Sequence, residues 1–405
     1  MNSRESRTST AEVRRFYGMF ASSQFIVDSS IWSFYFTQSC GLSLASAVAV
    51  HATTTIASGM LDLPTGSWAD RFGRRRIVFL GFATRAVAAL IMLAAPSLPM
   101  LFIAALLAGF GWAQLSGASE ALLHDNLKAV GAEASFKQHM ANVVIASYIA
   151  RTAAFALSGF LFVIAPWLPY ATLLAALLGG MLLASSLPER PYEKAESQAD
   201  LEHIASGARV YLRAPDLLRF ALVSLAIGIV SEQLWFSLQP LLSHANFSPP
   251  TVGLAYAAGS LGSAFGAYAA KKLLLRHKEE LALAAAVACF GLGALLFSCF
   301  GGKAACATAL LVTCIGFGAS WTATSGVLNA NVPSSHRAVC LSLLSALGTT
   351  LQGLLGSAIG LAFDRFGSSA VPATVAICAA LLVPAAFRTV KTLKYRGGEC
   401  RESPA

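Results

Sequence analysis

Six ionisable residues lie inside long apolar stretches of this chain, where a charge is costly and is rarely kept without a use. They are Asp28, Asp62, Arg85, Glu120, Arg151 and Glu232. Because four acids face only two bases, two carboxyl groups have no base to pair with inside these stretches. Desolvation favours the neutral form of a buried carboxyl group, which can then carry a proton. These residue types predict ion pairing and proton transfer rather than bond-breaking chemistry.

Three of these residues lie near the middle of their apolar segments. Asp28 and Arg151 are each roughly 17 Å from the end of the segment at 1.5 Å per residue, and Glu232 is slightly deeper. We predict that Asp28 and Arg151 form a pair that a substrate or a proton can break. Glu232 has no base at its depth, so it is the first candidate for a proton-coupling residue, followed by Asp28 and then Glu120.

A purely structural interpretation of the same charges stays open. Static salt bridges between helices would use these residue types without moving any proton. We favour this interpretation for Asp62 and Arg85, as structural intramembrane charges. For Asp28, Arg151 and Glu232 we favour a place at a central cavity, in which Arg151 is the cavity charge.

The segments that carry these residues are long enough to cross a bilayer. Each has about 18 to 26 residues, enough for a hydrocarbon core of roughly 30 Å, and a backbone in lipid must satisfy its own hydrogen bonds, so each is predicted to be a helix. Of the 405 residues, 56% are hydrophobic and 12% are charged, whereas a soluble protein has about 25% charged residues. The sequence predicts an all-α membrane protein with twelve transmembrane helices, at residues 16–38, 44–66, 76–95, 100–122, 140–164, 168–187, 217–241, 251–270, 281–300, 304–329, 338–363 and 370–387.

The basic residues fix the predicted orientation of these helices. With the N-terminus inside, 25 of the 29 Lys and Arg residues fall on the inner side, and only Lys303 and Arg365 fall outside. Positive charge concentrates on the cytoplasmic side of membrane proteins. Both termini are therefore expected in the cytoplasm, and the net charge of +9 has a source in topology and gives no reason to expect a nucleic-acid partner.

One charged loop divides the chain into two sets of six helices. We predict an N-terminal six-helix bundle at residues 1–187, a cytoplasmic linker at 188–216, and a C-terminal six-helix bundle with a cytoplasmic tail at 217–405. The linker has two open interpretations, an amphipathic helix on the membrane surface or a solvated connection.

A dense motif connects the second and third predicted helices. It reads Gly66-Ser-Trp-Ala-Asp70-Arg71-Phe-Gly73-Arg74-Arg75-Arg76. Gly73 allows a tight turn at little steric cost, across which Asp70 and Arg74 can meet. A loop that is merely basic would set topology, but it would not need Gly66, Asp70 or Gly73.

This motif resembles the loop between helices 2 and 3 of the major facilitator superfamily, G-x-x-x-D-R-x-G-R-[RK]. The resemblance covers the whole chain and implies two six-helix bundles around a central cavity, with transport by alternating access. It also implies that Asp70 meets the inner start of helix 11 and that Arg74 pairs with Asp125. The implied cytoplasmic gate consists of Gly66, Asp70, Arg71, Gly73, Arg74 and Asp125.

Two further stretches resemble bacterial exporter-like members of the superfamily. Asp62-Leu63-Pro64-Thr65-Gly66 is similar to their [ED]-[IL]-P-T-G sequence, and Ser116 to Asp125 is similar to S-G-x-x-E-A-L-x-x-D. Two features of related antiporters are missing. Residues 151–160 lack the Gly-x-x-x-Gly-Pro pattern of helix 5, and residues 109–114 lack the arginine of helix 4.

Three functional hypotheses follow. The first is proton-coupled export of a small organic molecule, drug-like or siderophore-like. The second is uptake of a nutrient or a metal chelate by the same fold. The third, from another class, is a non-transporting membrane receptor or scaffold, which six intramembrane charges argue against.

Enzymatic chemistry finds no support in the sequence. The histidines have no metal-ligand spacing, and no G-x-x-x-x-G-K-[ST] sequence occurs, so we expect no enzyme, no cofactor and no metal site. The expected partners are a small-molecule substrate, protons and the lipid bilayer. We expect a monomer in a bacterial inner membrane.

Overall fold

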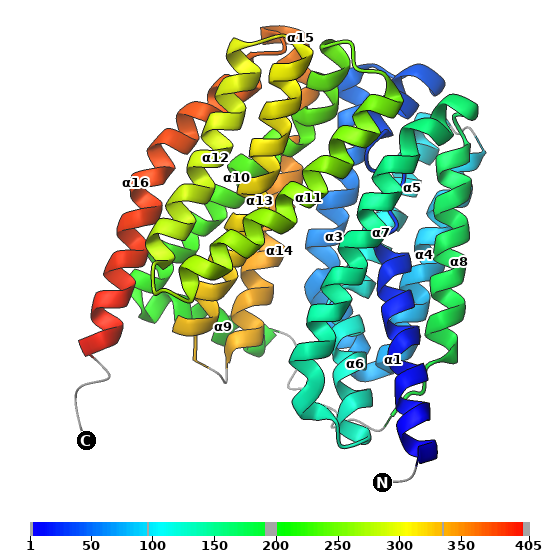
Figure 1. Cartoon of the computed structure of the whole chain (residues 1–405), viewed down its shortest axis with the longest axis vertical. Coiled ribbons are helices and arrows are strands. Elements are labelled where there is room, and N and C mark those ends of the chain that lie inside the picture. The colour runs from blue at the N-terminus through cyan, green and yellow to red at the C-terminus, as the bar shows by residue number, and fades with distance from the viewer. Residues whose placement is uncertain (1–2, 95–96, 191–200, 334–335, 400–405) are drawn as a thin grey trace.

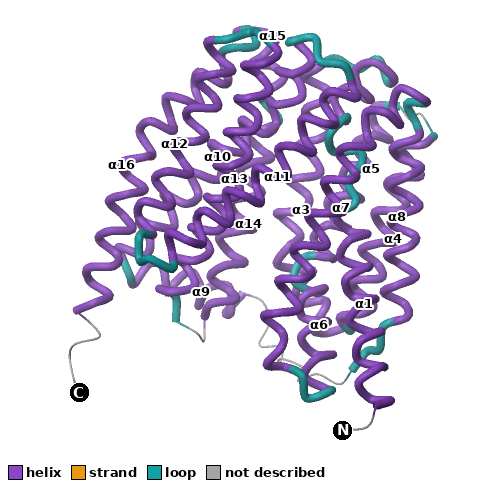
Figure 2. Tube along the Cα trace, viewed as in Figure 1, coloured by secondary structure: helices purple, strands orange, loops and turns teal. Residues whose placement is uncertain are grey.

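The computed structural model describes residues 3–94, 97–190, 201–333 and 336–399, and these parts of the chain are almost entirely helical (Figures 1 and 2). The helices run between two faces of the molecule. The first residue of α1 and the last of α16 lie on the same face, the lower one in Figure 1. We call this the terminal face and the other the distal face.

The helices of the first half are α1 (Ser3–Gln24), α2 (Trp32–Phe34), the π-helix η1 (Tyr35–Ser39), α3 (Leu44–Phe72), α4 (Arg74–Leu93), α5 (Leu98–Leu115), α6 (Ala118–Ala129), the 3-10 helix η2 (Glu133–Ser135), α7 (Phe136–Ile164) and α8 (Leu168–Ser186). Those of the second half are α9 (Leu201–Arg213), α10 (Pro215–His244), α11 (Pro249–Leu274), α12 (Glu279–Cys299), α13 (Lys303–Asn331), α14 (Arg337–Gly356), α15 (Ile359–Phe366) and α16 (Ala370–Glu399).

Ten helical segments of the described chain are long and apolar enough to cross a membrane, with α5–α6 and α14–α15 each counted as one. The two remaining spans have physical reasons to fall below that limit. The first span, α1 to η1, is interrupted. The eighth, α11, is rich in glycine, alanine and serine, because it packs closely against α7 and α13. Together they make up the predicted all-α fold of twelve transmembrane helices.

Three of the predicted spans are broken rather than continuous. The first was expected as one helix over residues 16–38, but α1 ends at Gln24 and helix resumes at Trp32. The fourth was expected over residues 100–122, but Gly117 has φ of 57° and separates α5 from α6. The eleventh was expected over residues 338–363, but α14 ends at Gly356 and α15 begins at Ile359. The length of an apolar segment indicates whether it can cross the lipid, but it does not indicate where the helix is interrupted.

The twelve spans form two bundles of six. In the first bundle α4 packs against α5 and α8, and α1 packs against α7 and α8. In the second, α12 packs against α13 and α16, and α10 packs against α14 and α16. The two bundles are joined mainly through α7 with α11 and through α3 with α14 and α15.

Small residues bring the two bundles close at these joints. A Cβ added at Gly159 of α7 would overlap the carbonyl of Pro249 at the start of α11. A Cβ added at Gly59 of α3 would lie 2.6 Å from the backbone nitrogen of Thr350 in α14. Helices in membranes pack closely through such residues, since hydrophobicity alone does not drive them together in lipid.

The charged loop between the bundles contains a helix that docks on the second bundle. Tyr211 of α9 donates a hydrogen bond to the carbonyl of Cys340 at 3.0 Å, and Gly207 faces Val339 of α14. Residues 201–213 are therefore a helix packed against protein and not a solvated connection, and its place on the membrane surface stays a prediction. Residues 191–200 of the predicted linker lie outside the described parts.

Candidate functional site

The centre of the molecule contains a non-helical stretch of the first span, residues 25–31. Irregular backbone at membrane depth is tolerated only where protein or water satisfies its polar groups. Here the side chain of Gln239 in α10 supplies both a hydrogen-bond donor and a hydrogen-bond acceptor. Its Nε2 donates to the carbonyl of Ser29 at 2.7 Å, and its Oε1 accepts from the backbone N–H of Ser33 at 2.9 Å. The side chain that fastens this stretch of the first bundle thus comes from the second bundle.

Gln239 was not recognised from the sequence as a functional residue. It is fully buried and precedes Pro240 in α10, a mostly apolar helix that also carries Glu232 and Gln233. A neutral amide in such a segment is a weak signal. The partners of Gln239 lie about two hundred positions away in the chain, so only the fold reveals the contact.

Asp28 lies in this non-helical stretch, and the base that acts on it is Arg85 of α4. The Arg85 side chain is almost fully buried. Its Nη1 donates to the carbonyl of Ser23 at 3.0 Å, and its guanidinium lies 3.9 Å from the ring centre of Trp112. Arg85 therefore stabilises the end of α1 as well as the charge of Asp28.

The predicted pair of Asp28 with Arg151 is wrong for this conformation. Arg151 of α7 donates a hydrogen bond to Oε1 of Gln24, the last residue of α1, and its guanidinium lies 5.6 Å from the ring centre of Tyr148. No Asp or Glu of the described chain lies within 4.0 Å of its nitrogens. Equal depth along two helices did not bring Asp28 and Arg151 together, because contact also depends on the direction in which each side chain leaves its helix.

Glu232 lies on the side of α10 that faces the first bundle. Phe236 and Gln239 follow it at i+4 and i+7, so the three share one face of the helix. Phe236 contacts His51 of α3, with ring centres 5.4 Å apart, and Gln239 fastens the non-helical stretch. Within the described chain, no hydrogen bond or ion pair is found for Glu232. The structure thus leaves an acid of the second bundle and Arg151 of the first without a charged partner.

Aromatic rings close the space between the bundles on the distal side of these charges. The rings of Trp32 and His51 are stacked at 4.5 Å, and His51 meets Phe236 edge-on. On the other side of the interface, Phe155 contacts Tyr256 with ring centres 5.6 Å apart. Several aromatic residues of the first span are buried, namely Trp32, Phe34, Tyr35 and Phe36, so they belong to packed protein rather than to a lipid-facing surface.

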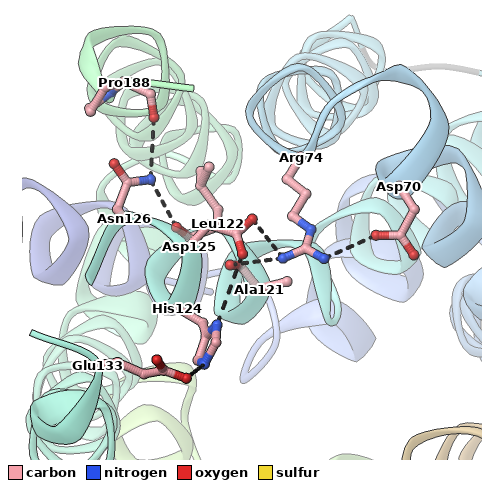
Figure 3. A network of polar contacts seen from close by, with 9 residues as sticks. All are labelled: Asp70, Arg74, Ala121, Leu122, His124, Asp125, Asn126, Glu133 and Pro188. Carbon is pink, nitrogen blue, oxygen red and sulfur yellow. Dashed lines mark hydrogen bonds and ion pairs between the residues drawn. The ribbon is translucent and has the colours of Figure 1, made fainter. Parts of the chain in front are cut away.

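At the terminal face, Arg74 lies between two acids (Figure 3). Its Nη1 donates to Oδ2 of Asp125 at 2.7 Å and to the carbonyl of Ala121 at 3.2 Å. Its Nη2 donates to Oδ1 of Asp70 at 3.2 Å. Gly73, between α3 and α4, has φ of 104°, a conformation that residues with a Cβ rarely adopt. That turn directs Arg74 back toward Asp70 and across to α6.

The other residues of this face have separate surroundings. Arg71 is exposed and lies 5.4 Å from the ring centre of Phe72. Nothing lies within 4 Å of the position that a Cβ would take at Gly66. Asp62 lies within hydrogen-bonding reach of Ser116 at the break between α5 and α6. Glu120 is exposed in the first turn of α6.

Solved structures share this architecture. The nucleoside transporter NupG superposes with a TM-score of 0.71 at 15% identity, over 95% of this chain and 99% of that one. A bacterial homologue of the human lysosomal transporter Spinster, in an inward-facing and unoccupied conformation, gives 0.72 at 15% identity, over the full length of both chains. The POT family transporter PepTSo gives 0.69 at 12% identity, over 97% of this chain and 99% of that one.

Sequence comparison supports the same assignment. No curated protein matches the sequence significantly. Residues 16–361 match the sequence profile described as Major Facilitator Superfamily, and that range contains the Gly66–Arg76 motif and every span except the last, α16. The fold and this match indicate a transporter rather than an enzyme. The chain belongs to the Major Facilitator Superfamily.

Proposed function

We propose that the protein exports a small organic molecule, drug-like or siderophore-like, in exchange for protons that flow inward. The observation that carries this proposal is Glu232, a carboxyl group on the face of α10 toward the other bundle, with no base beside it in the described chain. Such a group can take up and release a proton as its surroundings change. The resemblance of residues 62–66 and 116–125 to exporter-like members supports the outward direction.

The proposed orientation places the terminal face in the cytoplasm. The clusters of Arg and Lys at the ends of α3, α11 and α16 lie on this face, as the distribution of positive charge in membrane proteins requires. In this orientation the described contacts between the bundles lie on the outer side, from which we infer a conformation open to the inside. The described contacts between the bundles extend from Gly159 and Pro249 at the distal face to Thr152 and Ser260 near mid-height, and the ribbons diverge toward the terminal face (Figure 1).

The proposed cycle moves residues 1–187 against residues 217–405, with 188–216 as the connection. Opening to the outside must break the two hydrogen bonds of Gln239, since they join the bundles on the distal side. In that state the Asp70–Arg74–Asp125 cluster is expected to meet the inner start of the eleventh span, α14, and to hold the cytoplasmic gate closed. Gly66 has open space beside it here, which is consistent with a close approach that forms only in the other state.

In the proposed coupling, Glu232 takes up a proton when the outside is open and releases it when the inside is open. Asp28 is the second candidate, and Arg85 beside it can hold the charge that remains after the proton leaves. Glu120 is the third, since it is exposed in the first turn of α6, beside the break between α5 and α6. Asp62 and Arg85 keep the structural role that we favoured from the sequence.

Proton release in energised, inverted membrane vesicles tests this proposal. A panel of toxic organic compounds is added, and the collapse of the pH gradient is followed with a fluorescent dye. We expect at least one compound to collapse the gradient in vesicles with the wild-type protein. The Glu232→Gln protein, at equal abundance, should lose most of that response, and Asp28→Asn should lose part of it. Full responses in both variants would show that neither acid carries the coupling proton.

Uptake is the second candidate function. The missing Gly-x-x-x-Gly-Pro pattern in residues 151–160 and the missing arginine in residues 109–114 favour it, because both are features of related antiporters in this superfamily. Cells without the protein distinguish the two directions. Sensitivity to a toxic compound supports export, whereas loss of growth on a nutrient supports uptake.

A further inference from the structure

Not every charged side chain inside the bundles has an oppositely charged neighbour. Asp28 and Arg85 act on each other, which leaves Arg151 as the second base. Its contacts are the neutral amide of Gln24 and the ring of Tyr148, and its Nε is buried without a hydrogen-bond partner. An isolated charge in a low-dielectric interior costs several kcal/mol, so a cation kept in this position needs a counter-charge at some stage of its work.

The side of α7 on which Arg151 lies identifies where that counter-charge must come from. Ile149, Leu157 and Phe160 are exposed, large and apolar, and they mark the lipid side of the helix. Arg151 lies roughly opposite this side at 100° per residue. It precedes by one turn Phe155, which contacts Tyr256 of the other bundle. Arg151 therefore faces the space between the bundles, just inside the distal closure.

Glu232 occupies the corresponding position in the second bundle. It precedes by one turn Phe236, which contacts His51 of the first bundle. Arg151 and Glu232 thus lie near mid-height of α7 and α10, each one turn to the terminal side of an aromatic contact that joins the bundles. One unpaired cation and one unpaired anion face the same interbundle space from opposite sides.

We propose that the transported molecule is zwitterionic, with an anionic group that binds Arg151 and a protonated amine that binds Glu232. A guanidinium can bind a carboxylate through two parallel hydrogen bonds. Gln24 accepts from Arg151 through Oε1, which leaves its amide N–H groups available to donate to the same anion. Trp235 and Tyr256, whose ring centres are 5.4 Å apart, offer an aromatic wall beside Glu232 for an apolar body.

This substrate class rests on the proposed function and explains how the exchange would be coupled. A protonated amine and a proton compete for the carboxylate of Glu232. Binding of the substrate from the inside releases the proton there, and protonation from the outside releases the substrate. The anionic group selects the substrate without taking part in that competition.

Thermal stability of the purified full-length protein tests the substrate class without any pH gradient. The probes are ω-amino carboxylates of increasing length and phenylalanine-containing dipeptides, each compared with its N-acetyl and its carboxamide derivative. We expect the wild type to be stabilised by at least one zwitterion over both of its derivatives. Arg151→Gln should bind that zwitterion about tenfold to a hundredfold more weakly and should no longer distinguish it from the carboxamide.

Glu232→Gln is the matched variant for the other end of the molecule. It should still distinguish the carboxylate from the carboxamide, but it should no longer distinguish the amine from the N-acetyl group. Equal stabilisation by a zwitterion and its two derivatives, or no zwitterion-specific stabilisation at all, would overturn the proposal. Labelling of Arg151 in the wild type by phenylglyoxal, with and without the zwitterion, gives a second readout if Arg151→Gln does not fold. Unchanged labelling would contradict an anion site at Arg151.

The two proposals can fail separately. If the zwitterion-specific pattern holds but Glu232→Gln keeps its full response in energised vesicles, the substrate class stands and the proton path through Glu232 does not. If the proton response depends on Glu232 but no zwitterion binds selectively, the coupling stands and the substrate class is wrong.

Discussion

At the scale of single residues, the chemistry depends on whether each charge has a partner in this conformation. Arg74 has two carboxylates, at 2.7 Å and 3.2 Å, and Arg85 acts on Asp28. Charge-assisted hydrogen bonds such as those of Arg74 are stronger than neutral ones. Arg151 and Glu232 have no charged partner in the described chain, and these two residues carry the proposals on substrate and coupling.

The Arg74 cluster gives the first prediction at this scale. Asp70→Asn removes the charge that faces Arg74 while keeping the shape of the side chain. We expect transport to fall to a small fraction of the wild-type rate with normal abundance in the membrane, because the outward-open state would lose an inner-face ion pair. Transport assays with quantified membrane protein measure both quantities.

Arg74→Ala provides the companion variant, since it removes the partner of both acids. The gating role predicts a loss of transport at least as large as in Asp70→Asn. Unchanged transport in both variants would remove that role from the cluster, and reduced abundance alone would indicate a purely structural one.

The sequence predicted some of the side-chain contacts in the site and not others. The meeting of Asp70 and Arg74 followed from a short motif whose turn is local, and the contact of Arg74 with Asp125 was implied by the family resemblance. The pair of Asp28 with Arg151 was inferred from depth alone, and it is not formed in this conformation. Depth follows from counting residues along an axis, whereas the partner of Asp28 depends on the break after Gln24 and on the rotation of α4.

At the scale of elements, the interrupted first span is the feature that links the two bundles. Residues 25–31 give up helical hydrogen bonds, and Gln239 of α10 supplies a partner to the Ser29 carbonyl within this stretch and to the Ser33 N–H just after it. Phe25, Ile26 and Val27 are as apolar as the helical residues around them, so hydropathy predicts one continuous helix. The break depends on a side chain more than two hundred positions away, which local sequence cannot reveal.

Gln239→Leu tests this linkage. The carbonyl of Ser29 and the N–H of Ser33 would then lack partners in the distal-closed state, and a buried unpaired backbone group costs about 1–3 kcal/mol. We expect the equilibrium to shift by roughly tenfold or more toward the state that is open on the distal face. Distances between spin labels at Ser43 and Ser243, in a cysteine-free background, report the shift directly.

Gln233→Leu is the matched control on the same helix. The Nε2 of Gln233 donates to the carbonyls of Ile229 and Gln352, and both belong to the second bundle. Its loss should leave the distribution of distances unchanged. An equal shift in both variants would show that α10 was disturbed in general and that Gln239 has no particular role in the closure.

At the scale of the whole molecule, hydropathy and charge predicted the twelve spans because lipid imposes both constraints on every membrane helix.

The orientation of the helices across the membrane is a separate prediction. Epitope tags inserted after Ser197 and at the C-terminus should both be protected from external reagents in intact cells and accessible after permeabilisation. A C-terminal tag that is accessible from outside would overturn the topology and reverse the faces of the proposed cycle.

The distal closure also depends on close packing between the bundles, where α7 meets α11. A leucine at Gly159 cannot be accommodated beside the carbonyl of Pro249 without separating the two helices. Because Gly159 is buried in the interface and lies a full turn beyond Phe155 toward the distal face, the strain falls on the distal-closed state and is relieved when the bundles part there. We therefore expect Gly159→Leu to favour the distal-open state and to slow transport while the fold is kept.

The spin-label pair at Ser43 and Ser243 measures this variant too, and Gly179→Leu is its control. Gly179 lies in α8, and nothing is within 4 Å of the position that its Cβ would take. A longer mean distance in Gly159→Leu, with an unchanged distance in Gly179→Leu, is the expected result. If Gly159→Leu keeps the wild-type distance and rate, α7 and α11 do not control the closure, which then depends on the hydrogen bonds of Gln239 and on the contacts of α3 with α14 and α15.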